Sequence, residues 1–135
     1  MAISDYKLSE PPKLVELESY SDFRGDLLSL ELSKFDFGFC RFFMISFSST
    51  DISRGEHAHK KCAQFLFSAS GFNVLSLNLG GIKNFQILPG WGLLVPPYNW
   101  IQISSKVPDC KIVVLASEPY DPADYIKERP ILENS

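Results

Sequence analysis

Short apolar runs separated by polar turn residues are the main pattern of this chain. The runs that favour strands are residues 27–32, 41–47, 64–68, 72–79, 84–88, 92–95, 100–103 and 111–116. Gly and Pro stand between them, and Gly80-Gly81 between two apolar runs predicts a tight hairpin. Because no segment between the runs has the helical period, the pattern predicts an all-β fold, an antiparallel sandwich or barrel.

The two ends of the chain depart from this pattern. Residues 1–13 form a polar lead before the first apolar run. A short helical segment is predicted at residues 122–128, because Asp121 is suited to cap it and Pro122 to occupy its first position. The 135 residues are enough for one hydrophobic core, so we expect a single domain, 1–135.

Composition removes several classes of function. The net charge of -3 gives the chain no general attraction for nucleic acid or for an anionic membrane surface. No apolar run approaches the roughly 18 residues that a membrane-spanning helix needs. Residues 1–12 are too polar for a secretory signal, so we expect a cytoplasmic protein. Cys40, Cys62 and Cys110 include no CxxC pair, and we interpret all three as reduced residues of the core.

Both histidines of the chain, His57 and His59, lie two residues apart in a segment that also holds Arg54 and Lys60. In a strand they point to one face with Ala58 on the other, and in an unbroken strand Cys62 would also face away from them. Two imidazoles beside two cations are suited to proton transfer, to metal binding or to anion binding. From residue chemistry alone these three roles stay open.

The spacing around this pair resembles the first cupin motif, HxH(x)4E(x)6G. His57, His59 and Gly71 match it, but Gln64 stands where the family has its glutamate ligand. Residues 96–101 resemble the second motif, Pro-x-Gly-x-x-His, with Ile101 at the position of its histidine. The resemblance implies a cupin-type jelly roll, and the two replaced ligands leave a poor donor set, so we expect no metal and no cofactor.

A narrower resemblance covers roughly residues 20 to 130. Residues 54–60, Arg-Gly-x-His-Ala-His-Lys, and residues 114–126, Val-Leu-Ala-Ser-x-x-Tyr-Asp-x-x-Asp-Tyr-Ile, resemble the dTDP-4-keto-6-deoxyhexose 3,4-ketoisomerases, a metal-independent cupin family. Arg24-Gly25 and Arg41 before its aromatic strand are also similar to that family.

The resemblance implies an isomerase that moves a carbonyl of a dTDP-linked 4-keto-6-deoxyhexose from C4 to C3 through an enediol. His57 and His59 are then the catalytic pair, since a neutral imidazole both accepts and donates a proton. Which of the two is the base stays open, as does the configuration of the product, on which Ile101 bears. The implied pathway is synthesis of a 3-amino-3,6-dideoxyhexose for surface glycans.

Substrate binding is assigned to polar and aromatic residues on several strands. Arginine and lysine suit the diphosphate, and an amide or indole suits the sugar or base. The candidates are Arg24, Arg41, Arg54, Lys60, Gln64 and Trp100. The family commonly has a tyrosine after the strand arginine, where this chain has Phe43 and Met44, so Tyr98 or another group would have to replace it. The resemblance also implies a homodimer that exchanges N-terminal strands.

Three other functions remain in competition. A non-catalytic cupin that binds sugar nucleotides would also have this pocket, and the missing tyrosine favours it. A metal-dependent cupin enzyme would need more ligands than the motifs supply. An epimerase of the related sugar-nucleotide class is a third, although its arrangement of histidine and aspartate is not evident in the sequence.

Overall fold

The computed structural model describes residues 5–132, and nearly all of its regular structure is strand. The elements in chain order are β1 (Lys13–Glu16), β2 (Glu18–Asp22), β3 (Gly25–Ser29), the 3-10 turn η1 (Leu32–Lys34), β4 (Arg41–Ser46), β5 (Arg54–His59), β6 (Gln64–Phe67), β7 (Phe72–Asn78), β8 (Gly81–Ile87), β9 (Trp91–Val95), β10 (Trp100–Ser104), β11 (Lys111–Ala116), the 3-10 turn η2 (Pro122–Asp124) and β12 (Tyr125–Ile126). The predicted all-β fold is confirmed.

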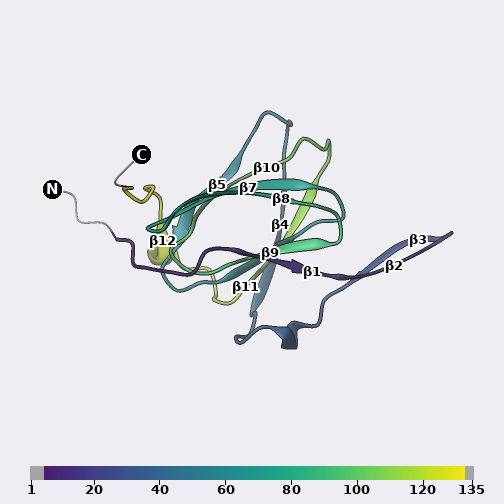
Figure 1. Ribbon diagram of the computed structural model, residues 1–135, viewed down its shortest axis with the longest axis horizontal. Helices are drawn as coiled ribbons and strands as arrows, with labels where there is room; N and C mark the ends of the chain where they lie inside the picture. Colours follow the sequence, from purple (N-terminus) through teal and green to yellow (C-terminus); the bar gives the residue numbers. More distant parts are fainter. Residues whose placement is uncertain (1–4, 133–135) are drawn as a thin grey trace.

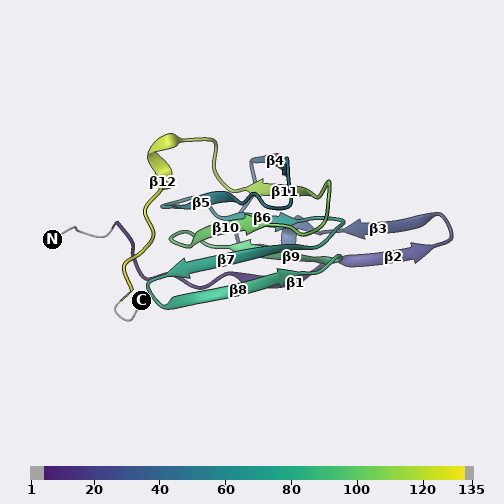
Figure 2. The ribbon, with the colours of Figure 1, turned by 90° about the horizontal axis from the view of Figure 1, so that it is seen from above.

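Two five-stranded antiparallel sheets form the body of the molecule (Figures 1 and 2). One has the strand order β1-β9-β6-β11-β4 and the other β12-β5-β10-β7-β8. The predicted hairpin joins β7 to β8, with Asn78 paired to Gly81 across the turn. No helix among residues 5–132 is long and apolar enough to cross a membrane.

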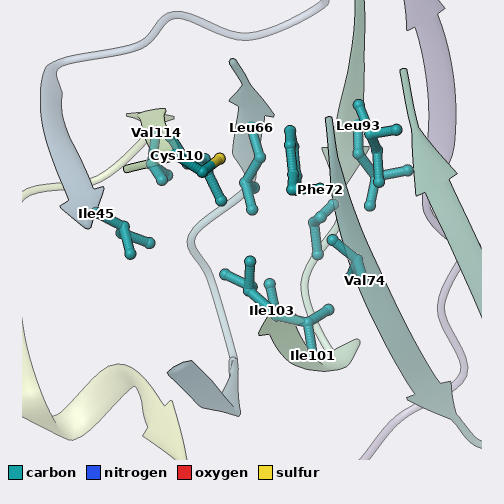
Figure 3. Packing of buried hydrophobic residues seen from close by; sticks show 12 residues of the cluster. Ile45, Leu66, Phe72, Val74, Leu93, Ile101, Ile103, Cys110 and Val114 are labelled. Atoms are coloured by element: carbon teal, nitrogen blue, oxygen red, sulfur yellow. The ribbon is translucent and has the colours of Figure 1, made fainter. Parts of the chain in front are cut away.

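Alternate side chains of the two sheets meet between them and form the main core (Figure 3). Strand β11 shows the cause, because its residues alternate between buried and more exposed positions as period-two geometry requires. The buried residues of this cluster are Ile45, Leu66, Phe72, Val74, Ile87, Leu93, Val95, Ile101, Ile103, Cys110, Ile112 and Val114. A smaller cluster covers the other face of the second sheet and contains Tyr6, Ala58, Leu77, Trp100 and Ile126.

The C-terminal segment is less helical than the sequence predicts. Asp121 does cap a helical turn, since its side chain accepts a hydrogen bond from the Ala123 amide, and Pro122 does occupy the first position. The turn ends at Asp124, however, and Tyr125 and Ile126 pair with β5 instead of continuing the helix to residue 128. Pairing with the edge of a sheet has overridden the local helical tendency.

Strands β2 and β3 form a hairpin that projects from the body along its long axis (Figure 2). Every residue of β2 is exposed, and so are the first three of β3. The hairpin nevertheless carries apolar side chains: Phe23 at its turn is 98% exposed, and Tyr20 and Leu27 are 59% and 58% exposed. Strand β3 ends at Ser29, three residues before the predicted limit.

Candidate active site

Strand β5 carries both histidines and is distorted just before them. Its register with β10 shifts by a bulge, and Gly55 has a φ of +89°. A Cβ at Gly55 would lie 3.0 Å from the carbonyl oxygen of Ile101, so glycine is required both by backbone angle and by space. Beyond the bulge the alternation is regular, and His57 and His59 share a face while Ala58 joins the cluster on the opposite face.

Three rings pack together on the histidine face. The ring centroids of His57 and His59 lie 5.0 Å apart. The ring of Tyr125 lies 4.6 Å from that of His57 and 4.4 Å from that of His59. Strand β12 brings this tyrosine into place, because Tyr125 is the partner of His59 in the register with β5.

The buried carboxylate of Asp124 holds His59. Its Oδ2 lies 2.9 Å from His59 Nδ1 and accepts a weaker hydrogen bond from the Cys62 amide at 3.3 Å. Its Oδ1 accepts hydrogen bonds from the amides of Lys60 at 3.1 Å and Lys61 at 2.7 Å. Because backbone N–H groups can only donate, both oxygens act as acceptors, and the carboxylate ties β12 to the turn after β5.

These contacts fix the tautomer of both imidazoles. His59 Nδ1 must carry the proton that it donates to Asp124, and His57 Nδ1 must carry the one that it donates to the carbonyl oxygen of Gly55 at 2.9 Å. Both Nε2 atoms therefore hold a lone pair in the neutral ring. His59 Nε2 is buried and has no hydrogen-bond partner among residues 5–132.

Burial lowers the pKa of both histidines. For His57 the hydrogen bond to Gly55 opposes this effect in part. For His59 the hydrogen bond to Asp124 raises the pKa, while the neighbouring charges of His57 and Arg41 lower it. Both rings are therefore held in the neutral form that can accept a proton near neutral pH.

An open cleft of about 470 Å³ lies against this face. Its lining residues are Gly55, Glu56, His57, Tyr120, Pro122, Tyr125 and Lys127. Arg41 stands beside it, with its guanidinium 5.8 Å from the ring centroid of Tyr120 and hydrogen-bonded to the carbonyl oxygen of Glu118 at 3.2 Å. The structure thus brings Arg41 into the neighbourhood of the histidine pair.

Trp100 lies on the opposite face of the second sheet from the histidines, whereas Gln64 faces the interior between the sheets. Trp100 belongs to the cluster on the opposite face of the second sheet, where its Nε1 donates to the carbonyl oxygen of Lys127 and Arg129 lies over its ring. The structure therefore does not bring Trp100 to the histidines, contrary to the sequence-based assignment. Gln64 is buried on the inward face of β6, and Ala116 of β11 is its register partner on one side and that of Arg41 on the other, so Gln64 and Arg41 point to the same face.

The remaining predicted cations are spread over the molecule. Arg54 begins β5, at the end opposite His59, and its exposed guanidinium reaches the carbonyl oxygen of Ser46 at 3.3 Å. Lys60 lies next to the site but contributes its backbone amide to Asp124. Arg24 lies in the turn of the β2–β3 hairpin, paired with Asp22 at 2.6 Å, at the far end of the molecule from β12 (Figures 1 and 2).

The donor set does not suit a resident metal ion. His59, Cys62 and Asp124 each place a ligand atom within 4.8 Å of the others. The carboxylate oxygens already accept four hydrogen bonds, however, one of them from His59. At the second cupin position Ile101 is an apolar residue of the core.

Sequence reasoning missed Asp124 and Tyr125 and misplaced Cys62. The arrangement of histidine and aspartate that was not evident in the sequence is present as His59 and Asp124, 65 residues apart. Strand β5 ends at His59 and the chain turns, so Cys62 approaches His59 instead of facing away from it. Cys62 and Cys110 are buried as expected, whereas Cys40 is exposed, and its assignment to the core is wrong.

Comparison with known proteins shows consistent similarity. A curated relative, the TDP-4-oxo-6-deoxy-alpha-D-glucose-3,4-oxoisomerase of Aneurinibacillus thermoaerophilus, is 34% identical over 119 residues, 86% of each chain. QdtA, a sugar 3,4-ketoisomerase from Thermoanaerobacterium thermosaccharolyticum solved with TDP, is 30% identical with a TM-score of 0.78 over 90% of each chain.

A second solved structure is WlaRB, a TDP-quinovose 3,4-ketoisomerase from Campylobacter jejuni. It is 32% identical with a TM-score of 0.75, covering 87% of this chain and 92% of that one. The family model described as FdtA: WxcM-like, C-terminal matches residues 10–132. With this match over most of its length, the chain belongs to the FdtA family (WxcM-like, C-terminal).

Proposed function

We propose that this protein is a TDP-sugar 3,4-ketoisomerase that converts TDP-4-keto-6-deoxyglucose into a 3-keto isomer. The observation that carries the proposal is the pair of neutral imidazoles, His57 and His59, fixed with their Nε2 atoms unprotonated. The relative at 34% identity is a 3,4-oxoisomerase of this sugar nucleotide, and QdtA has also been solved with TDP-4-keto-6-deoxyglucose.

The chemistry needs a base of near-neutral pKa and no electron carrier. One imidazole removes the proton from C3, and a proton is returned to C4 from the same side of the site. General acid–base catalysis by such groups contributes on the order of 10²–10⁴-fold. His57 lines the cleft directly, while His59 stands behind it, buried and held by Asp124.

Binding of the diphosphate is assigned first to Arg41. It is the predicted cation that stands beside the cleft, and its charge already acts on His59. A guanidinium offers two parallel hydrogen bonds to phosphate oxygens. Lys127, which lines the same cleft, is a second cation within reach of an anionic substrate.

We also propose a homodimer in which the β2–β3 hairpin crosses to a second copy. The exposed apolar side chains of the hairpin, with Phe23 98% exposed, support it. The edge strand β4, which exposes Phe42 and Met44, would offer the hairpin of a second copy an apolar surface, and this also supports the proposal. Exchange would carry Arg24 away from its own body and into the partner's site.

The test is incubation of the purified protein with TDP-4-keto-6-deoxyglucose in deuterated water, followed by NMR of the sugar. We expect a 3-keto product, formed at the same rate in the presence of EDTA. Turnover of His57→Asn should be lower than that of the wild type by about 10²-fold or more. Binding of TDP without any conversion would make the protein a nucleotide-binding cupin. Activity that EDTA removes and one metal restores would overturn the metal-independent mechanism.

A further inference from the structure

The isomerisation moves two kinds of proton, and the histidines account for only one of them. A proton leaves C3 and one reaches C4, but a proton must also leave O3 and one must reach O4. Protonating the C4 oxygen as the enediol forms removes negative charge from the transition state. A second acid–base group near the imidazoles is therefore needed.

Tyr125 is placed for this second role. Its ring contacts both imidazoles, at 4.6 and 4.4 Å between centroids, and it lines the cleft beside His57. Its backbone is fixed by pairing with β5 and by the hydrogen bonds of the preceding residue, Asp124. The phenolic hydroxyl makes no hydrogen bond to any part of the chain that the structure describes, so it is available to a ligand.

The other tyrosines meet fewer of these conditions. Strand β4 carries Phe43 and Met44 after Arg41, so it offers no phenol. Tyr98 packs against the cluster on the opposite face of the second sheet. Tyr120 lines the cleft, but its ring contacts are with Tyr125 and with the guanidinium of Arg41.

We propose that the phenol of Tyr125 is the catalytic acid and base for the two sugar oxygens, an inference that rests on the proposed ketoisomerase function. As a histidine takes the C3 proton, the C–H electron pair forms the C3–C4 double bond and the C4 carbonyl pair takes the phenolic proton. The phenolate then takes the O3 proton, the C3 carbonyl forms, and C4 takes its proton from the imidazolium. Phenol and imidazole both end in their starting states, so no co-reactant is required.

The experiment compares three variants that each lose one oxygen atom: Tyr125→Phe, Tyr120→Phe and Tyr98→Phe. Phenylalanine keeps the ring that packs on the histidines, so the fold is preserved. We expect Tyr125→Phe to lower kcat by about 10²-fold, as loss of a general acid does, with KM and the calorimetric affinity for TDP within about threefold of wild type. Tyr98→Phe is the control outside the cleft and should keep its turnover, whereas Tyr120→Phe tests the other phenol that lines the cleft and should lose less turnover than Tyr125→Phe.

Several outcomes would overturn the assignment. Near-normal turnover in Tyr125→Phe removes the phenol from the mechanism. An equal loss in Tyr120→Phe transfers the role to that residue, and a parallel loss of TDP affinity in Tyr125→Phe makes it a scaffold residue. The wild-type protein is assayed alongside: if it fails to convert the sugar nucleotide, the proposed function itself is wrong.

Discussion

At the scale of single residues, Asp124 decides how His59 is presented. Its carboxylate accepts the Nδ1 proton of His59 at 2.9 Å and is itself held by three backbone amides. An asparagine has similar size but replaces one acceptor oxygen with a donor, which would face either an imidazole N–H or a backbone N–H. The site is therefore sensitive to a change of one atom.

We predict that Asp124→Asn lowers kcat roughly 10²-fold while leaving KM nearly unchanged. The hydrogen bond to Asp124 raises the pKa of His59, so its loss should also move the acid limb of the pH profile to lower pH. Asp121→Asn is the matched control, because asparagine caps a helical turn as well as aspartate does. If Asp124→Asn had the pH profile and turnover of the wild type, Asp124 would not be the residue that positions His59.

The lowered pKa values of His57 and His59 predict how activity depends on pH. Burial is the main cause for both residues, whose ordinary pKa is 6.5. Since the base must be neutral, the acid limb of kcat/KM should have its midpoint below pH 6.5. A midpoint above that value, measured with TDP-4-keto-6-deoxyglucose as substrate, would contradict the assignment of the base to this pair.

The lowered pKa values of the two histidines also predict how the free energy of unfolding changes with pH. In the unfolded chain His57 and His59 have their ordinary pKa of 6.5, whereas in the folded chain both pKa values are lower. Around pH 6.5 the unfolded chain therefore binds more protons than the folded chain does. The free energy of unfolding should therefore fall as the pH drops below 6.5 and level off once the folded histidines are protonated too. Denaturant titration at several pH values measures this, and His57→Asn should show a smaller decrease.

At the scale of elements, short apolar runs bounded by Gly, Pro and other turn residues made most of the strands predictable. Strands β4, β6, β7, β9, β10 and β11 lie within one residue of the predicted ranges, because each is a short apolar run bounded by turn residues. The short strands β1 and β12 were not predicted. Their pairing with β9 and β5 is long-range, and no local pattern encodes it.

The candidate site was predictable where a strand holds two residues at i and i+2, as with His57 and His59. Asp124 and Tyr125 reach the histidines only through pairing between β5 and β12, so sequence reasoning could not connect them. Trp100 was a different case. Its neighbour Ile101 occupies the position of a cupin ligand, which points into the fold. Since adjacent residues of a strand point to opposite faces, the sequence already indicated that Trp100 points away from the histidines.

At the scale of the whole molecule, the projecting hairpin predicts that each site depends on two chains. Arg24 lies at the hairpin turn, far from its own histidines, whereas exchange would place it in the partner's site. Variants Arg24→Ala and His57→Asn should each be weakly active as pure homodimers. Refolded together, they should form mixed dimers with one intact site, recovering about a quarter of wild-type turnover when dimers form statistically.

The control for this complementation is each variant refolded with itself, which should recover nothing. Light scattering should give twice the 15.2 kDa mass of the chain for every sample. Mixed samples that stay inactive would place Arg24 outside the partner's site. A monomeric mass would remove the exchange altogether and leave Phe23 and Leu27 of the hairpin without a covering surface.

Asp124 and Tyr125 lie late in the chain, which affects when the site can form during synthesis. Synthesis runs from the N-terminus, so β5 and its histidines exist before the residues that complete the site. A growing chain whose two sheets have begun to close still lacks both the carboxylate that orients His59 and the ring that covers it. Each molecule can therefore become competent only after β12 has paired with β5 and brought Asp124 and Tyr125 to the histidines.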